Sequence, residues 1–130
     1  MNSTQLILGN GSEEYVAQWL KSKKYWAYIL PKKVGGQPFD IIACKENIVW
    51  MVDVKHIEDK ASFPFSRIEP NQRTSMRYAR ELANITNLGF VIKTNRDDLS
   101  LYFLSFDNLL ELEKNGAKSV KIEALPKWEI

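Results

Sequence analysis

Two aspartates and a lysine are the residues of this chain whose types and spacing suggest chemistry. Asp53 and Lys55 lie two positions apart at the end of an apolar run, and Asp40 opens the apolar run before it. Residues two apart in a β-strand point to the same face, so a carboxylate and an ammonium would share a largely apolar surface. Charges placed there are costly unless something compensates them. These three residues are therefore the first candidates for a functional site.

The spacing around a predicted turn brings the two aspartates together. If residues 46–47 form a hairpin turn, Lys45 pairs with Ile48. Counting back along the two strands then places Asp40 opposite Asp53. Opposite residues have Cβ atoms roughly 4.5–5.5 Å apart, and two carboxylates that close raise one another's pKa. A divalent cation removes this repulsion, and hard oxygen ligands suit Mg²⁺.

Lys55 has two interpretations. Beside a bound cation, its ammonium could orient a water molecule or stabilise charge on a phosphate. The alternative is a buried salt bridge between Lys55 and either aspartate, with no chemistry.

The elements that must position these residues alternate in the order αβββαββα, which predicts an α/β fold with a mixed β-sheet flanked by helices. The predicted helices are 13–24, 70–84 and 107 to about 115, and the predicted strands are 25–30, 39–44, 48–55, 89–94 and 101–106. Ser12 and Asp107 are the expected N-caps of the first and last helices. Residues 56–69 are expected to form a loop. The strand 48–55 lacks alternation, so both of its faces should be covered.

Composition indicates one soluble globular domain over residues 1–130. The hydrophobic fraction is 45% and the formal net charge is +2, which excludes a strongly basic polyanion-binding protein but allows a local basic patch. No run approaches the roughly 20 apolar residues that span a membrane. No basic flank precedes the short apolar run 6–8, so we expect no signal peptide and a cytoplasmic location.

The motif Pro38-Phe39-Asp40 followed by Asp53-Val54-Lys55 resembles the signature of the PD-(D/E)XK nuclease superfamily. The chain also resembles RecU-type Holliday-junction resolvases over about residues 35–112. The flanking segments that carry this resemblance are 60–66, 71–72, 89–92 and 101–106. The resemblance implies a restriction-endonuclease-like fold and a metal-dependent endodeoxyribonuclease.

The resemblance also implies roles for individual residues. Asp40 and Asp53 would bind Mg²⁺, for which Mn²⁺ could substitute, and the backbone carbonyl of Val54 would add a ligand. Lys55 would assist the water. The chain departs from the family in carrying Asp53 where the relatives have glutamate, and in having only residues 30–37 where they have a protruding stalk. The missing stalk bears on junction specificity and not on the chemistry.

Two helical residues are expected to complete the site. A glutamate of the first helix usually does so in the resembled family, and Glu13 fits the inward stripe better than Glu14; the alternative for both is favourable charge at a helix N-terminus. Gln72 lies on the inward stripe of the 70–84 helix. In the resembled family such a glutamine lies beside the metal, and the alternative is an ordinary hydrogen-bonding residue at the helix start.

A rim of cations around the acidic residues would suit phosphate contacts. The candidates for DNA binding are Lys32, Lys33, Arg67, Arg73, Arg77 and Arg80. An alternative for Arg77 is a pair with Glu81 on a solvated face. Phe63 and Phe65 are candidates for contact with DNA or a second subunit, whereas Trp19, Trp26, Trp50 and Phe103 are expected in the core.

These features together predict a Holliday-junction resolvase that acts on four-way DNA. A homodimer is expected, because symmetric cutting of two strands needs two equivalent sites. One alternative is a PD-(D/E)XK nuclease acting on other DNA, in restriction or phage DNA processing. Another is a non-catalytic DNA-binding module with the same fold.

Overall fold

The computed structural model describes the backbone of residues 3–34, 36–58, 61–94 and 100–130, and the side chains of these ranges from residue 11 onwards. The helices are α1 (Ser3–Ser22), α2 (Pro70–Ala83) and α3 (Phe106–Lys114), with 3-10 turns at Phe65–Arg67 and Ile122–Ala124. The strands are β1 (Trp26–Ile29), β2 (Ile41–Lys45), β3 (Ile48–Ile57), β4 (Ser62–Pro64), β5 (Leu88–Thr94), β6 (Leu101–Ser105) and β7 (Ser119–Lys121).

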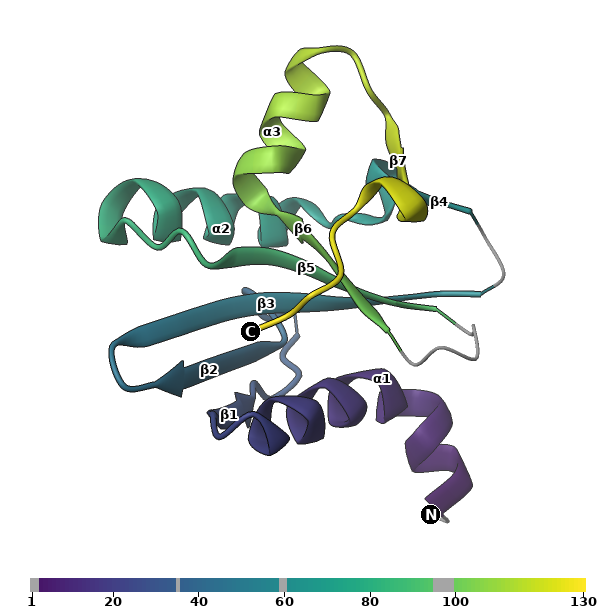
Figure 1. The fold of residues 1–130 in the computed structure, drawn as a ribbon, viewed down its shortest axis with the longest axis vertical. Coiled ribbons are helices and arrows are strands. Elements are labelled where there is room, and N and C mark those ends of the chain that lie inside the picture. Colours follow the sequence, from purple (N-terminus) through teal and green to yellow (C-terminus); the bar gives the residue numbers. More distant parts are fainter. Residues whose placement is uncertain (1–2, 35, 59–60, 95–99) are drawn as a thin grey trace.

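Five strands form one mixed sheet in the order β1-β2-β3-β5-β6. β3 and β5 are parallel, and the other neighbouring strands are antiparallel. Helix α1 lies against one face of this sheet, and α2 and α3 lie against the other (Figure 1). The predicted class and the order of the predicted elements are confirmed, with β4 and β7 added.

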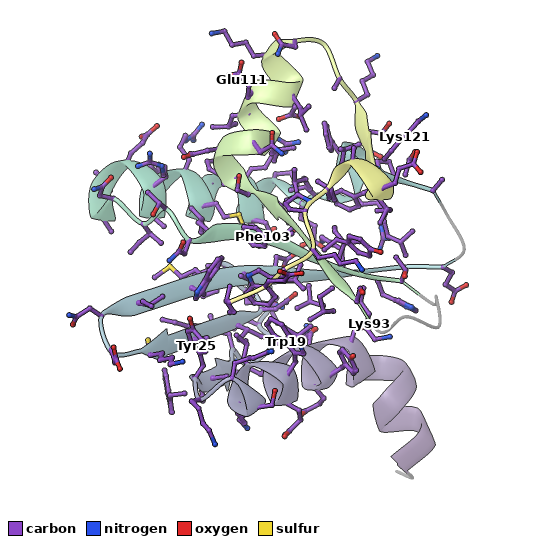
Figure 2. The ribbon with its side chains drawn as sticks, in the orientation of Figure 1. Trp19, Tyr25, Lys93, Phe103, Glu111 and Lys121 are labelled. Carbon is purple, nitrogen blue, oxygen red and sulfur yellow. The ribbon has the colours of Figure 1, made fainter. Side chains whose placement is uncertain are left out.

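The sheet separates two apolar clusters. Leu20 and Val52 belong to the cluster on the α1 side, where Figure 2 also places Trp19 between the helix and the sheet. Met76 and Phe90 belong to the cluster under α2 and α3. The central strand β3 is therefore covered on both faces, as its continuous apolar run predicted. Polar side chains on β3 must find partners inside the protein, which is the setting of the candidate site.

Two predicted helix starts are wrong. Helix α1 begins at Ser3 and runs through Ser12, so Ser12 is not a cap. A serine inside a helix costs only a few tenths of a kcal/mol relative to alanine, which the packing of α1 readily offsets. The N-cap of α3 is Ser105, whose hydroxyl accepts the backbone N–H three residues later at 3.0 Å. Asp107 instead lies in the first turn, where a carboxylate is favourable beside the helix dipole.

The segment predicted as a loop over 56–69 is largely structured. β3 continues to Ile57, and β4 pairs antiparallel with β7 in a second, two-stranded sheet. Phe63 and Phe65 are consequently buried in the cluster under α2 and α3, and the expectation that they contact DNA or a second subunit is wrong. Trp26 also departs from prediction: it is 59% exposed, because it lies on the edge strand β1 and faces away from α1.

Within the described ranges, none of the helices is both long enough and apolar enough to cross a bilayer.

Candidate active site

The β2–β3 hairpin has the predicted register. Ile41 pairs with Val52, and the next position along this ladder sets Asp40 opposite Asp53. Asp40 immediately precedes β2, and Asp53 lies in the middle of β3. The side chains of both residues are almost completely buried. The two carboxyl groups, called the acidic pair below, are thus brought together by local hairpin geometry.

Polar contacts from neighbouring residues hold the side chain of Asp40. Gln37 Nε2 donates a hydrogen bond to its Oδ1 at 2.8 Å. The backbone N–H of Val54 donates to its Oδ2 at 2.7 Å. Lys32 Nζ lies 3.7 Å from Oδ1. The bond from Val54 ties the carboxylate of Asp40 to the strand that carries Asp53.

Asp53 contacts a lysine of its own strand and a glutamine of α2. Gln72 Nε2 donates to Asp53 Oδ1 at 2.8 Å. Lys55 Nζ lies 3.0 Å from Asp53 Oδ2 and donates to Gln72 Oε1 at 3.2 Å. The same Gln72 oxygen accepts the backbone N–H of Glu69, the N-cap of α2, at 3.1 Å. The first turn of α2 therefore fixes an amide between the carboxyl group of Asp53 and the ammonium of Lys55.

Burial raises the pKa of Asp53 to about 8, and the charge of Asp40 and a hydrogen bond with it act in the same direction, while Lys55 opposes them. Without a metal, the charged form of Asp53 is therefore disfavoured. Asp53 Oδ2 lies 3.0 Å from the ammonium of Lys55 but has no hydrogen-bond partner among the described residues. A buried carboxyl oxygen without a hydrogen bond is costly, and a bound cation would offset that cost.

Helix α1 contributes one of the two candidate glutamates. The side chain of Glu13 is 14% exposed, and its Oε2 lies 2.7 Å from Lys32 Nζ, the same ammonium that approaches Asp40. Burial raises the pKa of Glu13, and the nearby charge of Asp40 contributes, although the hydrogen bond from Lys32 opposes the shift. Glu14 is exposed on the helix. The structure thus brings Glu13, and not Glu14, to the acidic pair.

The arrangement suits a cation that needs few protein ligands. Among the residues that the structure describes, no three His, Cys, Asp or Glu side chains come close enough to hold a metal ion by themselves. The donors that gather are the carboxyl groups of Asp40 and Asp53, with Lys32 between Asp40 and Glu13. Mg²⁺ usually keeps several waters and takes only one or two carboxylates. The unsatisfied Oδ2 of Asp53 and the oxygen-only donor set therefore fit Mg²⁺.

Two of the predicted DNA-binding arginines are engaged with α3. Arg73 forms two hydrogen bonds with the carboxylate of Glu113, both 2.8 Å long. Arg80 Nε lies 3.0 Å from Asp107 Oδ1. These pairs clamp α2 to α3. A role for either arginine in DNA binding remains a prediction.

The other predicted cations are differently placed. Arg67 is exposed and donates a hydrogen bond to the backbone oxygen of His56 at 2.9 Å. Arg77 is exposed, with its guanidinium 5.8 Å from the centroid of the Tyr78 ring. Lys33 is exposed on the loop before β2. Lys32 contacts Glu13 and Asp40, and its binding to DNA stays a prediction.

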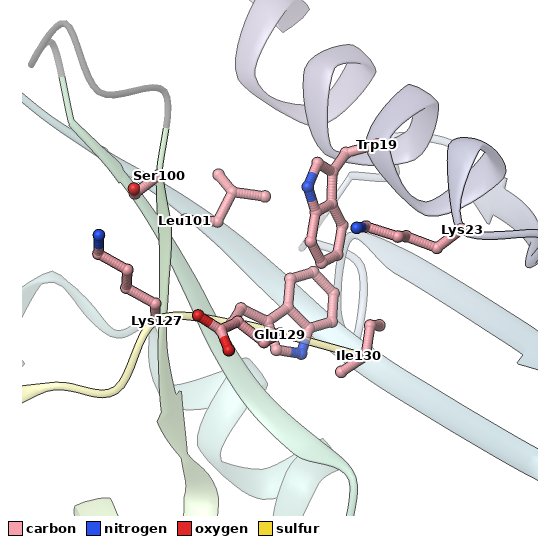
Figure 3. A pocket seen from close by; sticks show the side chains of 8 residues that line it. Trp19, Lys23, Ser100, Leu101, Lys127, Glu129 and Ile130 are labelled. Carbon is pink, nitrogen blue, oxygen red and sulfur yellow. The ribbon is translucent and has the colours of Figure 1, made fainter.

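A separate cavity of about 430 Å³ lies between α1, the start of β6 and the C-terminal segment (Figure 3). Its lining residues are Trp19, Lys23, Ser100, Leu101, Lys127, Trp128, Glu129 and Ile130. The rings of Trp19 and Trp128 stack with centroids 4.8 Å apart, and Trp128 also stacks on Phe103. These contacts hold the C-terminal segment against the sheet, and the lining includes none of the predicted site residues.

Comparison with known proteins gives a match in structure and not in sequence. No protein-family model matches the chain, and no curated protein matches it. A solved structure of Hjc, a Holliday junction resolvase from the archaeal hyperthermophile Archaeoglobus fulgidus, matches with a TM-score of 0.67 and 13% identity, over 92% of this chain and 95% of that one. The chain has the fold of a Holliday junction resolvase. This confirms the predicted restriction-endonuclease-like α/β architecture and, at the level of the fold, the resemblance inferred from the sequence.

Sequence reasoning missed two contacts of the acidic pair. Gln37 donates to Asp40, and Lys32 bridges Asp40 and Glu13. The loop that carries both residues has no periodicity from which side-chain direction could be read. The only signal was position: both precede Asp40 by a few residues, in the segment that must lead into β2.

Proposed function

We propose that this protein is a metal-dependent endodeoxyribonuclease that hydrolyses phosphodiester bonds. The observation that carries the proposal is the buried, unsatisfied carboxyl oxygen of Asp53 beside Asp40 and Lys55. It lies in a chain whose fold matches that of a Holliday junction resolvase. Perturbed carboxyl groups in such a setting are more typical of a catalytic site than of a structural salt bridge.

Asp40, Asp53 and the backbone carbonyl of Val54 would hold Mg²⁺, for which Mn²⁺ could substitute. The cation would neutralise the acidic pair and supply Lewis-acid chemistry at the scissile phosphate. Lys55 is placed by Gln72, so its ammonium can orient the attacking water or stabilise charge that develops on the phosphate. Glu13 would add a carboxylate from α1. Gln72 acts as a positioning residue, because it binds Asp53 and Lys55 at once.

The proposed substrate is four-way DNA. The similarity to Hjc supports this choice, since that protein is a Holliday junction resolvase. A homodimer in the cytoplasm would present two equivalent sites to the two strands that must be cut. The runner-up is a nuclease of the same fold that acts on other DNA, and a non-catalytic DNA-binding module is the third possibility.

The predicted basic rim, comprising Lys32, Lys33, Arg67, Arg73, Arg77 and Arg80, would contact phosphates around the site. Arg77 and Lys33 are the members whose exposure favours such contacts most directly.

Replacing Asp53 with asparagine tests the proposal. Asp53→Asn removes an anionic ligand while keeping the shape of the side chain, so it should abolish Mg²⁺-dependent cleavage while DNA binding stays within about twofold. Calorimetry should show that Mn²⁺ binds the unmodified protein and binds the variant much more weakly. Asp107→Asn, a change on the surface of α3, is the matched control and should retain cleavage. Undiminished cleavage by purified Asp53→Asn would refute the assignment of the site.

A further inference from the structure

Lys32 contacts the candidate site, whereas the adjacent Lys33 does not. Its side chain is 56% exposed, yet its Nζ lies 2.7 Å from Glu13 Oε2 and 3.7 Å from Asp40 Oδ1. Lys33, the next residue, is exposed and forms no ion pair within the part of the chain that the structure describes. One of two adjacent lysines thus turns its ammonium into the site, while the other stays at the surface.

The ammonium of Lys32 lies between carboxylates of two separate elements. Glu13 comes from α1, and Asp40 from the start of β2. The cation therefore neutralises part of a site that holds three acidic side chains. A divalent ion bound at Asp40 would repel the ammonium, whose Nζ lies 3.7 Å from Oδ1 of that residue.

We propose that Lys32 is a displaceable counter-ion of the metal centre: it neutralises Glu13 and Asp40 in the metal-free protein, leaves when a divalent cation binds, and then contacts a DNA phosphate. This inference depends on the metal site of the proposed function. The exposed stem of Lys32 allows the movement, since a lysine has four rotatable side-chain bonds and the residue lies on a loop.

The displacement should cost little. A partly exposed ion pair is a weak interaction, so competition from Lys32 should lower the affinity for metal by only about two- to fivefold. Once released, the ammonium lies at the rim of the site, where a phosphate contact contributes about one unit to the salt dependence of DNA binding. Metal binding and phosphate binding are thereby coupled through one side chain.

The test compares Lys32→Met with Lys21→Met, an exposed lysine of α1, both in the full chain. Methionine removes the charge while keeping an unbranched side chain. Calorimetry with Mn²⁺ and no DNA should show Lys32→Met binding the ion about two- to fivefold more tightly than the unmodified protein, with Lys21→Met unchanged. Equal or weaker Mn²⁺ binding by Lys32→Met overturns the proposal.

A second measurement follows DNA binding as a function of salt, using a synthetic four-way junction, with and without Ca²⁺ as a metal that supports binding without cleavage. Lys32→Met should lower the salt slope by about one only when Ca²⁺ is present, because the ammonium is otherwise held by Glu13 and Asp40. A loss of equal size with and without Ca²⁺ overturns the proposal.

Failure of the role proposed for Lys32 can be distinguished from failure of the metal site. If the unmodified protein and Lys32→Met bind Mn²⁺ equally well, the metal site stands and only the role of Lys32 falls. If neither binds Mn²⁺, the metal centre of the proposed function falls, and the role of Lys32 falls with it.

Discussion

Asp53 is the residue at which the stability of the fold and the proposed function oppose one another. It is completely buried, it faces a second carboxyl group, and one of its oxygens has no hydrogen bond in the described part of the chain. A folded protein tolerates such a residue by keeping it protonated or by binding a cation. The burial of this carboxyl group lowers the stability of the metal-free fold, and the same burial would favour binding of a cation.

This opposition predicts how stability depends on pH. Because the pKa of Asp53 is about 8 in the folded chain and 3.8 when exposed, the folded state holds one more proton between those values. The free energy of unfolding of the metal-free protein should therefore fall as pH rises from about 4 to 8.

Asp53→Asn lacks the titrating group, so it should show a shallower fall and should exceed the unmodified protein in stability at pH 8. Urea unfolding in a chelator at pH 5, 6.5 and 8 measures both curves. Identical slopes for the two proteins would mean that Asp53 does not hold its extra proton.

The two glutamates at positions 13 and 14 give a paired test of how α1 contributes. Glu13 lies beside Lys32 and Asp40, whereas Glu14 faces solvent. Glu13→Gln should therefore lower cleavage by tenfold or more, on the order of the effect of losing a group that supports a metal centre, and Glu14→Gln should leave it within about twofold. Cleavage rates of purified proteins at saturating Mg²⁺ decide the ranking. The reverse order would place the wrong face of α1 at the site.

Among the elements, helix α2 contacts both the candidate site and helix α3. Its first turn presents Gln72 to the site, and its arginines pair with Glu113 and Asp107 of α3. Arg77, on the same flank, is exposed. The three arginines of this helical stripe therefore differ in role. Arg73 and Arg80 hold α2 against α3, whereas Arg77 faces solvent.

That division predicts different consequences for two arginines. Arg73→Ala should lower the free energy of unfolding by about 1 kcal/mol, because it removes a partly exposed bidentate pair. Arg77→Ala should change stability by less than about 0.5 kcal/mol but should reduce the salt slope of DNA binding by about one. Urea unfolding and salt-dependent binding to a four-way junction separate the two effects. A larger stability loss for Arg77→Ala would reverse the assignment.

The elements nearest the site could be predicted from sequence because their signals are local. A two-residue turn sets the β2–β3 register, and this places Asp40 opposite Asp53 without any tertiary information. Glu46 adopts the left-handed conformation that such a turn requires (φ 55°). Gln72 was predicted to face inward from helical periodicity, and it is buried.

The features that the sequence did not predict depend on contacts between residues far apart in the chain. β4 and β7 have three residues each and lie more than fifty positions apart, so neither carries a pattern that predicts their pairing. The burial of Phe63 follows from that pairing. Arg73 finds Glu113 forty positions along the chain, and only the packing of α2 against α3 determines that contact. Trp26 was expected in the core from residue type, and the position of β1 at the sheet edge decided otherwise.

As a whole molecule, the chain matches nearly the full extent of Hjc. The match covers 92% of this chain and 95% of Hjc, at 13% identity. The fold brings the acidic pair, Lys55 and Gln72 together. The proposed resolvase would have to cut two strands, which requires two copies of this site on one four-way junction.

Cleavage of labelled DNA shapes is the decisive measurement for the proposed nuclease. With Mg²⁺, the protein should introduce paired, symmetric nicks in a synthetic four-way junction at concentrations that leave linear duplex of the same sequence uncut. Asp53→Asn should bind that junction without cutting it. Linear duplex cut as fast as the junction would contradict the resolvase assignment, and the absence of cleavage of every DNA shape in Mg²⁺ or Mn²⁺ would contradict the nuclease itself.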